Sequence, residues 1–276
     1  MLIKELMAKK GISEYRIYRP QAGEEYFISP EGAGVSSILV AFFPYLTKEH
    51  DGGGNLALYT QGLDYHIWVK ERLEEVSEEL RRLYPDDFFR VQVDIGEVDE
   101  KEIARRSGLG MRGINSLVIH ERYGSYGFLG LILTSAVLEA YMTPPRDCLR
   151  CMICQSRCPG QAIRGDFTID TARCASAISQ KKEELSEEEE AILRRSGKVF
   201  GCDICQRCCP HNQDIEYAPV GTFHKSSIEE EEIFSLSGKA FSRQYKNRSF
   251  AWRGKKIIER NMRLLSSAED EEKEKE

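Results

Sequence analysis

The cysteine spacing is the strongest chemical signal in this chain. One run matches C-x2-C-x2-C-x3-C-P, in which three thiolates surround one cubane cluster and the fourth, before the proline, ligates a second cluster. It consists of Cys148, Cys151, Cys154 and Cys158, followed by Pro159. The pattern therefore predicts two [4Fe-4S] clusters and a partner run of cysteines.

The partner run is slightly irregular, and a proline again follows its last member. It consists of Cys202, Cys205, Cys208 and Cys209. Reciprocal sharing gives the first cluster Cys209 as its fourth ligand and gives the second cluster Cys158, beside the first two cysteines of the partner run. Spacing leaves Cys174 and Cys208 as competing candidates for the remaining position.

A pair of four-thiolate zinc sites is the alternative, because C-x2-C pairs also suit tetrahedral zinc. Zinc ribbons usually contribute their thiolates as two separated pairs. Closely repeated cysteines that end in a proline are instead the ferredoxin arrangement. We therefore favour iron–sulfur clusters, and two adjacent clusters imply electron transfer.

The composition predicts a folded protein of the cytoplasm without a membrane anchor. Of the 276 residues, 41% are hydrophobic and 30% charged, as in globular proteins. The N-terminus meets a charge at Lys4 and builds no signal peptide, and no stretch approaches the roughly 18 apolar residues of a membrane span. Disulfides are rare in that compartment, so nine cysteines favour metal binding.

The net charge of -6 argues against a protein that coats nucleic acid over its whole surface.

The first half alternates strand and helix patterns. Apolar and β-branched runs predict strands, and apolar residues at helical spacing predict helices. We expect strands at residues 37–43, 89–93, 116–119 and 128–133, and helices at residues 65–83 and 99–107. These elements predict an α/β or α+β domain over residues 1–142, ended by the Thr143–Pro145 break.

Two Gly-rich turns lie between these elements, at Asp51–Asn55 and Gly108–Gly113. The second turn fits G-x-G-x-x-G. A dinucleotide fingerprint follows a strand and opens a helix, whereas this one follows a predicted helix and leads into a strand. We therefore do not expect a classical NAD site.

The second half divides into three predicted regions. Residues 143–220 form a ferredoxin-like domain, residues 221–266 a basic C-terminal extension, and residues 267–276 an acidic tail expected to be disordered. Inside the ferredoxin-like domain, Ser186 and Glu189 form a capping-box pattern. This pattern predicts a helix in the charged segment that separates the two cysteine runs.

Motifs in both halves resemble the cobalamin-dependent epoxyqueuosine reductases, a family akin to the reductive dehalogenases. The resemblance extends from about Leu39 to Leu264. It is carried by Asp64-Tyr65-His66, Val93–Glu97, Ala104–Gly113, Gly124–Gly130, Gly201–Gln206, Cys209–Asn212, and Phe241, Tyr245, Arg253 and Arg260-Asn261.

The resemblance implies an α+β protein, with a nitroreductase-like α/β domain that binds cobalamin followed by a ferredoxin-like domain with two [4Fe-4S] clusters. It also implies the reaction of that family, which removes the epoxide oxygen of epoxyqueuosine in the tRNA anticodon loop to give queuosine. The expected partners are tRNA and a low-potential electron donor. In such an enzyme the cofactor performs the redox step, and the protein supplies orientation and a proton.

Two carboxylic acids match acids of the family's active site. Asp94 matches the family's proton donor. Such a donor is needed because an epoxide oxygen that leaves as hydroxide takes up a proton. The alternative explanation of Asp94 is a residue that begins a turn. Asp64 matches a second acid near the site, and its alternative is a residue at a helix N-terminus.

The resemblance also suggests cofactor contacts. Cys174 falls where the family completes its second cluster, which leaves Cys208 as the spare thiol. Asp94, Ser176 and the backbone around Val118 and Leu129 fall where the family contacts cobalamin. Small residues packed beside a cluster are the alternative explanation.

Several positions depart from the family. This chain has Met111 and Ile114 where Trp and Lys are usual, and Leu131 where Glu is common. Family members commonly continue into C-terminal helical repeats that help to hold tRNA, and we expect a short form without them. These departures affect the expected substrate more than the expected cofactors.

The C-terminal extension interleaves cations with aromatic residues, a composition suited to phosphate contact and base stacking. The cations are Arg243, Lys246, Arg248, Arg253, Lys255, Lys256, Arg260 and Arg263, and the aromatic residues are Phe241, Tyr245, Phe250 and Trp252. An amphipathic helix with its aromatics in the core is the favoured alternative. Two other functions stay open: a diverged corrinoid iron–sulfur protein that reduces a small molecule or passes electrons to a partner, and a cluster-only carrier.

Overall fold

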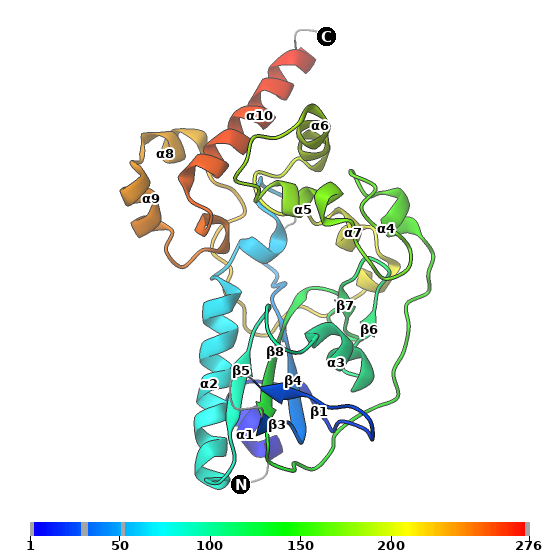
Figure 1. Ribbon diagram of the computed structural model, residues 1–276. Coiled ribbons are helices and arrows are strands. Elements are labelled where there is room, and N and C mark those ends of the chain that lie inside the picture. Colours follow the sequence, from blue (N-terminus) through cyan, green and yellow to red (C-terminus); the bar gives the residue numbers. More distant parts are fainter. Residues whose placement is uncertain (1–2, 29–32, 51–52, 274–276) are drawn as a thin grey trace. The chain divides into compact units, whose positions relative to one another are not determined.

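The computed structural model describes residues 3–28, 33–50 and 53–273 (Figure 1). The chain folds into two compact units that interleave along the sequence. Unit 1 comprises Met1–Pro44, Tyr65–Gly113 and Leu117–Leu149, and unit 2 comprises Tyr45–Asp64, Ile114–Ser116 and Arg150–Glu276. The units therefore do not follow the linear boundaries predicted at residues 142 and 220.

Unit 1 contains an antiparallel sheet and three helices. Its helices are α1 (Ile3–Lys9), α2 (Tyr65–Leu83) and α3 (Glu100–Arg106). Its strands are β1 (Glu14–Tyr18), β2 (Phe27–Ile28), β3 (Ala33–Gly34), β4 (Ser37–Pro44), β5 (Phe89–Gln92), β6 (Met111–Arg112), β7 (Val118–Ile119) and β8 (Gly127–Thr134).

The main sheet of unit 1 has the strand order β1-β4-β8-β5. All three pairings are antiparallel, and Val40 of β4 lies opposite Arg16 of β1 and Leu131 of β8. The predictions of β4, β5, β8, α2 and α3 are confirmed. The predicted strand at residues 116–119 is reduced to two residues, and β1 was not predicted.

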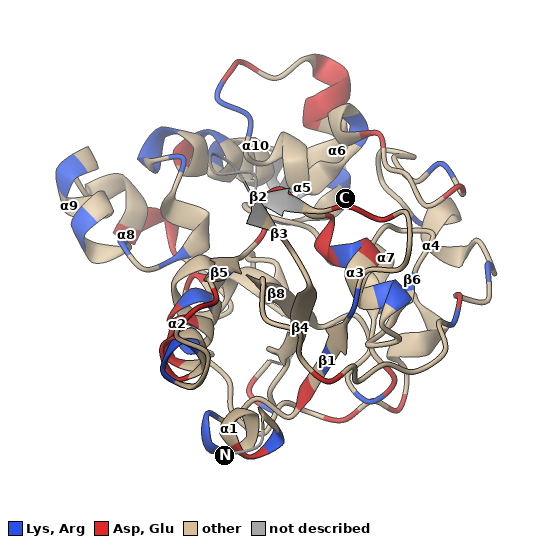
Figure 2. Cartoon of the chain, turned by 60° about the horizontal axis from the view of Figure 1, so that its bottom comes forward, with Lys and Arg blue, Asp and Glu red and all other residues tan. Residues whose placement is uncertain are grey.

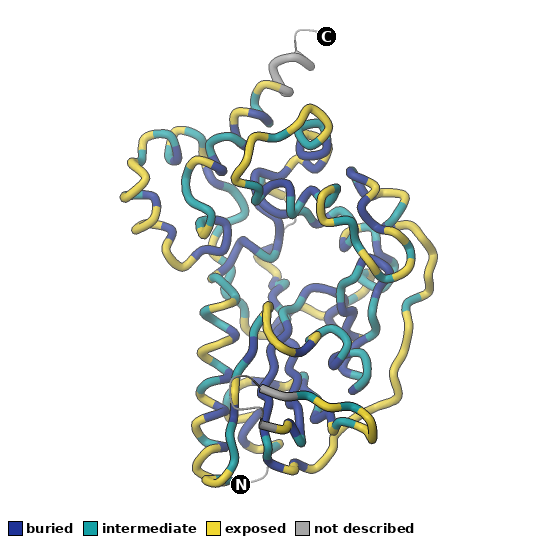
Figure 3. The backbone as a smooth tube through the Cα atoms, in the orientation of Figure 1, coloured by how far each residue is buried: buried dark blue, intermediate teal, exposed yellow. Residues whose placement is uncertain are grey.

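The two central strands are buried on both faces (Figure 3). Along β4, Leu39 and Phe43 enter the core that α2 covers, whereas Val40 and Phe42 enter the core that contains α3 residues. This alternation follows from the two-residue repeat of a strand. Leu73 of α2 is fully buried in the first of these cores.

Unit 2 is built mainly from short helices. Its α-helices are α4 (Ile153–Ser156), α5 (Ala175–Ile178), α6 (Glu187–Ser196), α7 (Ile204–Arg207), α8 (Glu230–Ser235), α9 (Gly238–Gln244) and α10 (Lys255–Lys273). Its 3-10 helices are η1 (Leu58–Thr60), η2 (Thr171–Arg173), η3 (Pro210–Asn212) and η4 (Ser249–Ala251). The predicted capping box of Ser186 and Glu189 opens α6, whose first turn is acidic (Figure 2).

Long-range hydrogen bonds explain why residues 45–64 belong to unit 2. The Asn55 amide donates to the Ile228 carbonyl at 2.8 Å and accepts from the Ile228 N–H at 3.0 Å. The buried Asp203 carboxylate accepts the Leu58 N–H at 3.0 Å. These bonds satisfy backbone groups that would otherwise be buried without partners.

Helix α10 extends to Lys273. The helix thus includes residues 267–273 of the tail that was predicted to be disordered, and residues 274–276 lie outside the described part of the chain; disorder of the tail stays a prediction. Ala, Glu and Lys have high helix propensities, so a composition too polar for a core still continues an existing helix. Along the described residues, no helix has the length and apolarity needed to cross a bilayer.

The packing of α2 is testable with two leucines of the same helix. Replacing Leu73, which is fully buried, with Ala should lower the free energy of unfolding by about 2 to 5 kcal/mol, because it removes apolar contacts and leaves a cavity. Leu83→Ala, at a side chain 45% exposed, should change it by less than about 0.5 kcal/mol. Urea denaturation followed by circular dichroism measures both, and equal losses would contradict the assigned burial.

Candidate active site and cluster-binding cysteines

Eight of the nine cysteines lie in unit 2, and Cys148 lies at the end of unit 1. All nine are free thiols. Cys154 lies on α4 and Cys205 on α7, and these two short helices pack against each other. Unit 2 therefore brings Cys154 of the first run and Cys205 of the second run onto packed helices, although about 50 residues of sequence separate them.

The thiols of unit 2 form two neighbouring groups. Burial raises the pKa of Cys154 to about 11, and the nearby thiols of Cys208, Cys209 and Cys151 raise it further in the same direction. Burial likewise raises the pKa of Cys202 to about 12, with Cys174 and Cys158 among the neighbours that contribute. Buried thiolates that repel one another suit positively charged iron, which makes this donor set fit for clusters.

This grouping separates the two candidates for the last ligand. Cys174 ends η2 just before α5 and is a charge neighbour of Cys202 and Cys205. Cys208 is a charge neighbour of Cys151 and Cys154, and also of Cys158. The assignment of Cys174 to the second cluster stays a prediction, which the grouping supports. Over the described residues, no three His, Cys, Asp or Glu side chains are placed to hold a single metal ion.

One predicted ligand already accepts a hydrogen bond from the backbone. The Ala162 N–H donates to the Cys158 sulfur at 3.3 Å. Hydrogen bonds to ligand sulfurs are one of the factors that set the reduction potential of a cluster. The loop after α4 therefore positions Cys158 and would tune its cluster.

The predicted proton donor, Asp94, lies in unit 1 just after β5. Its φ of 65° is left-handed, a conformation that Asp tolerates better than most residues. His66 Nε2, from the first turn of α2, lies 3.3 Å from Asp94 Oδ2, and the Tyr65 hydroxyl also bonds this carboxylate. The hydrogen bond from His66 lowers the pKa of Asp94, although burial acts in the opposite direction.

Aromatic rings form one wall beside this acid. The Tyr65 ring stacks on Phe128 of β8, with centroids 4.6 Å apart and planes 9° apart, and His66 stacks on Tyr65 at 4.0 Å. The rings fix the first turn of α2 against the sheet. His66 is thereby held where it reaches Asp94.

The edge of β8 becomes open at the same place. Strand β5 pairs with β8 only as far as Gln92 opposite Leu131, so no described strand covers the β5 side of Leu129. The Leu129 and Val118 side chains are buried in the core that contains α3 residues. A ligand at this edge would contact the backbone of Leu129 rather than its side chain, and the cobalamin contacts at Leu129 and Val118 stay predictions.

A further acid, Glu100, was not singled out from the sequence. Its carboxylate accepts the Asp94 N–H at 3.3 Å from the first turn of α3. Burial, with a smaller contribution from the Asp94 charge, raises the pKa of Glu100 to about 7, while Lys101 acts in the opposite direction. The spacing of six residues after Asp94 was visible in the sequence, but its burial was not.

The other two predicted site residues belong to unit 2. The Asp64 N–H donates to the Asn247 carbonyl at 2.8 Å, directly before α2 begins. The Ser176 hydroxyl bonds the Tyr59 side chain, and its carbonyl accepts from the Ser179 hydroxyl at 2.8 Å. These bonds give both residues a structural role, and their roles at the active site stay predictions.

The positions that depart from the family are largely buried. Leu131 is fully buried in a core of unit 1, and Ile114 is 2% exposed. Met111 is half-buried in β6. A glutamate at position 131 would place an unpaired charge in the core of this chain, so the apolar residue there is consistent with its surroundings.

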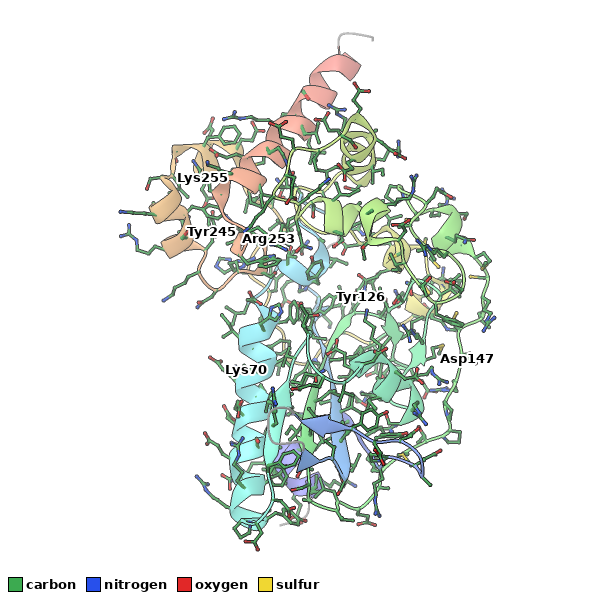
Figure 4. The ribbon with its side chains drawn as sticks, viewed as in Figure 1. Lys70, Tyr126, Asp147, Tyr245, Arg253 and Lys255 are labelled. Carbon is green, nitrogen blue, oxygen red and sulfur yellow. The ribbon has the colours of Figure 1, made fainter. Side chains whose placement is uncertain are left out.

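The basic C-terminal segment mostly serves packing. Phe241, Tyr245 and Phe250 are buried in the core of unit 2, as the amphipathic alternative predicts. Trp252 is instead 57% exposed, and the Arg253 guanidinium lies 3.7 Å from its ring centroid. Tyr245 and Arg253 are both labelled in Figure 4. This pair alone among the aromatic residues of the segment presents an exposed stacking surface.

Two of the predicted phosphate-binding cations are also structural. Arg248 is buried, donates to the Thr60 carbonyl at 3.2 Å, and has its pKa lowered to about 10 by burial. Arg260 donates to the carbonyls of Lys181 and Glu183 at 2.8 and 2.7 Å. Both guanidiniums donate to backbone carbonyls of unit 2 and so take the place of backbone N–H donors.

Comparison with known families gives two matches. Residues 147–212 match the family described as "4Fe-4S double cluster binding domain". Residues 32–95 match the family described as "Epoxyqueuosine reductase QueG, DUF1730". The chain thus contains a double-cluster domain at the place where the cysteine spacing predicted one.

Whole-chain comparisons point to one group of enzymes. The epoxyqueuosine reductase of Listeria monocytogenes is 32% identical over 80% of this chain and 59% of its own length, and that of Gloeobacter violaceus is 35% identical over 69% and 62%. The chain therefore spans less than two thirds of these relatives. These matches confirm the predicted family resemblance.

Solved structures confirm the fold. The epoxyqueuosine reductase from Streptococcus thermophilus superposes with a TM-score of 0.83 and 25% identity, over 95% of this chain and 79% of that one. An epoxyqueuosine reductase with a tRNA-Tyr epoxyqueuosine-modified stem loop gives a TM-score of 0.81 at 22% identity, over 95% and 80%. The predicted α+β class and its cluster domain are therefore correct.

The assignment of the ninth cysteine is directly testable. Cys174→Ser should remove one [4Fe-4S] cluster and lower the bound iron by about half, because a cluster needs four thiolates. Cys208→Ser is the matched control and should keep both clusters. Anaerobic reconstitution followed by iron and acid-labile sulfide analysis measures the difference. The reverse result would make Cys208 the ligand.

Glu100 should leave a signature in the pH dependence of stability. Its pKa is about 7 in the folded protein against an ordinary 4.5, so the folded state binds more protons between these values and loses stability as the pH rises. Glu100→Gln removes this loss, whereas an amide oxygen still accepts the Asp94 N–H. Between about pH 5 and about pH 8, the variant should gain up to roughly 3 kcal/mol relative to the wild type.

The measurement is urea denaturation at both pH values. Glu139→Gln, at an exposed carboxylate of unit 1, is the control and should follow the wild type. Parallel curves for Glu100→Gln and the wild type would show that Glu100 has an ordinary pKa.

Proposed function

We propose that this chain, a relative of the epoxyqueuosine reductases in sequence and in fold, is a cobalamin-dependent iron–sulfur reductase that converts epoxyqueuosine in tRNA to queuosine. The observation that carries the proposal is Asp94, which His66 and Tyr65 hold beside the open edge of β8. The double-cluster domain supplies the electron path that such a reduction needs. We place the protein in the cytoplasm, where its nine free cysteines stay reduced.

The residues of unit 1 fit a large flat cofactor. The uncovered backbone of β8 near Leu129 and the stacked rings of Tyr65 and Phe128 lie on neighbouring elements. Backbone groups without a strand partner are available to a ligand. When bound, cobalamin and the clusters would supply the two electrons of the reaction.

The protein's own residues supply the protons. Conversion of an epoxide to an alkene with release of water takes up two electrons and two protons. Asp94 would donate to the epoxide oxygen, and the binding of substrate and cofactor would exclude water and raise its pKa toward the protonated form. Glu100, which bonds the Asp94 backbone, is a second proton-holding group beside it.

A stem-loop complex of a related reductase supports tRNA as the substrate. In this chain, the exposed Trp252, with the Arg253 guanidinium against its ring, suits base stacking and phosphate contact. The buried Leu131 and Ile114 belong to the packing, so they do not argue for a different substrate.

Asp94→Asn tests the proposal. With reconstituted clusters, cobalamin and a low-potential reductant, the wild type should convert epoxyqueuosine in tRNA, and the variant should be slower by about 100-fold or more. Its iron content should equal that of the wild type, because Asp94 is not a predicted cluster ligand. Its cobalamin content is measured separately, so that a slower reaction is compared at equal cobalamin loading.

Glu97→Gln is the matched control, since Glu97 lies on the same loop and pairs with Arg90 at 3.1 Å. It should retain activity. Unchanged tRNA with fully loaded wild-type protein would refute the substrate and favour a corrinoid iron–sulfur protein that reduces another molecule. Full activity of Asp94→Asn would refute the role of the acid alone.

A further inference from the structure

The surface around one predicted cluster ligand has an unusual distribution of charge. Cys151 is exposed, whereas Cys154, Cys158 and Cys209 are buried. A cluster that uses Cys151 therefore approaches solvent at this ligand. Because electron transfer slows steeply with distance, an incoming donor would transfer most rapidly here.

Three arginines lie on the segments that carry this ligand and its neighbours: one in the loop before α4, one directly after α4 and one at the end of α7. They are Arg150, Arg157 and Arg207, and all three are exposed. Helix α4 packs against α7, which places Arg157, directly after α4, on the same pair of helices as Arg207, the last residue of α7. Within the described residues, none of the three forms an ion pair with a carboxylate.

The neighbouring carboxylates of this stretch are already engaged. Asp170 pairs with Arg164 at 3.2 Å, and Asp166 accepts the Thr168 N–H at 3.0 Å. Most other arginines with exposed side chains have acidic partners, as Arg82 has in Glu79 at 2.9 Å. Arg207 is also a charge neighbour of the buried Asp203 carboxylate, whereas no ion pair with a carboxylate is formed by Arg150 or Arg157 in the described part of the chain. In a chain of net charge -6, the arginines thus leave a local positive surface that internal carboxylates compensate only in part.

Apolar side chains lie between these cations. Met152 and Ile153 are 40% and 39% exposed. Arg150 and Met152 both have left-handed backbones, with φ of 52° and 62°, so the loop follows a tightly specified path on each side of Cys151. A small apolar centre with a charged rim is the usual anatomy of a transient protein interface.

We propose that Arg150, Arg157 and Arg207, with Met152 and Ile153, form the docking surface for a small acidic electron-carrier protein that reduces the cluster at Cys151. The inference rests on the proposed function in that it needs a reducible cluster there. With a flavodoxin as donor, the anionic flavin hydroquinone would lose one electron and become the neutral semiquinone. The cluster would gain that electron and pass from [4Fe-4S]2+ to [4Fe-4S]+.

The test uses the reconstituted full chain and reduced flavodoxin, whose semiquinone is followed by its red absorption. The triple variant Arg150→Glu, Arg157→Glu and Arg207→Glu should lower the second-order rate constant by about ten-fold or more at low salt, because it reverses the electrostatic attraction. Added salt should slow the wild type and reduce the difference. Calorimetric titration of oxidised flavodoxin into the oxidised protein should show a similar loss of affinity.

Three controls isolate docking from cluster damage. Lys239→Glu reverses an exposed charge on α9 of the same unit and should change the rate by less than about two-fold. Iron content and the rate of reduction by dithionite should be the same in all variants. If the charge reversals reduce cluster loading, the milder triple exchange of the same arginines to Gln provides the rate and affinity comparison.

Equal rates and affinities for wild type and fully loaded triple variant would overturn the proposal, as would a wild type that neither flavodoxin nor an acidic ferredoxin reduces. These outcomes are separate from those of the substrate test. Reduction through this surface without conversion of tRNA would refute the proposed substrate and leave the docking surface standing.

Discussion

The burial of closely spaced cysteine thiols is the constraint on which unit 2 depends. Thiolates at Cys154, Cys202 and Cys205 lose hydration and repel one another, which raises their pKa values. Without iron, the thiols must stay protonated in a site that has the geometry of a ligand set. The free energy of cluster binding is therefore expected to contribute to the folding of this unit, as it does in other small metal domains.

Unit 1 solves a different electrostatic problem. Its acid must hold a proton at neutral pH, yet the hydrogen bond from His66 lowers the pKa of Asp94. Glu100 shows the complementary effect: burial raises its pKa, and the negative charge of Asp94 raises it further. With a pKa of about 7, Glu100 is protonated in about half of the molecules near neutral pH, and exclusion of water from Asp94 would raise the pKa of that acid as well.

The sequence predicted elements whose signals are local. Helix α2 has the predicted bounds, Tyr65–Leu83, because apolar residues at helical spacing face one core. The capping box at Ser186 is likewise confirmed, since its two bonds join residues three apart. Cysteine spacing predicted the double-cluster domain for the same reason: its information lies within a few residues.

Features that depend on distant contacts were missed or misplaced. Residues 45–64 were assigned to the first domain, but Asn55 pairs with Ile228, 173 residues away. Strand β1 was not predicted because its five residues show only a weak alternation of apolar and polar side chains. Its Glu14 accepts a hydrogen bond from Arg122 at 2.7 Å, 108 residues later in the sequence.

The same limit applies to the active site. Asp94 was found by resemblance, whereas its partner His66 lies 28 residues earlier and Glu100 gains its unusual pKa only from burial. The spacing of cluster ligands can be read directly in the sequence of such a protein, because each cluster is bound by cysteines only two or three residues apart. Proton affinity is instead a property of the folded surroundings. Substrate reduction needs both cluster ligands and a proton donor. The cluster ligands of this chain could therefore be predicted from its sequence, whereas the groups that hold the proton could be described only from its structure.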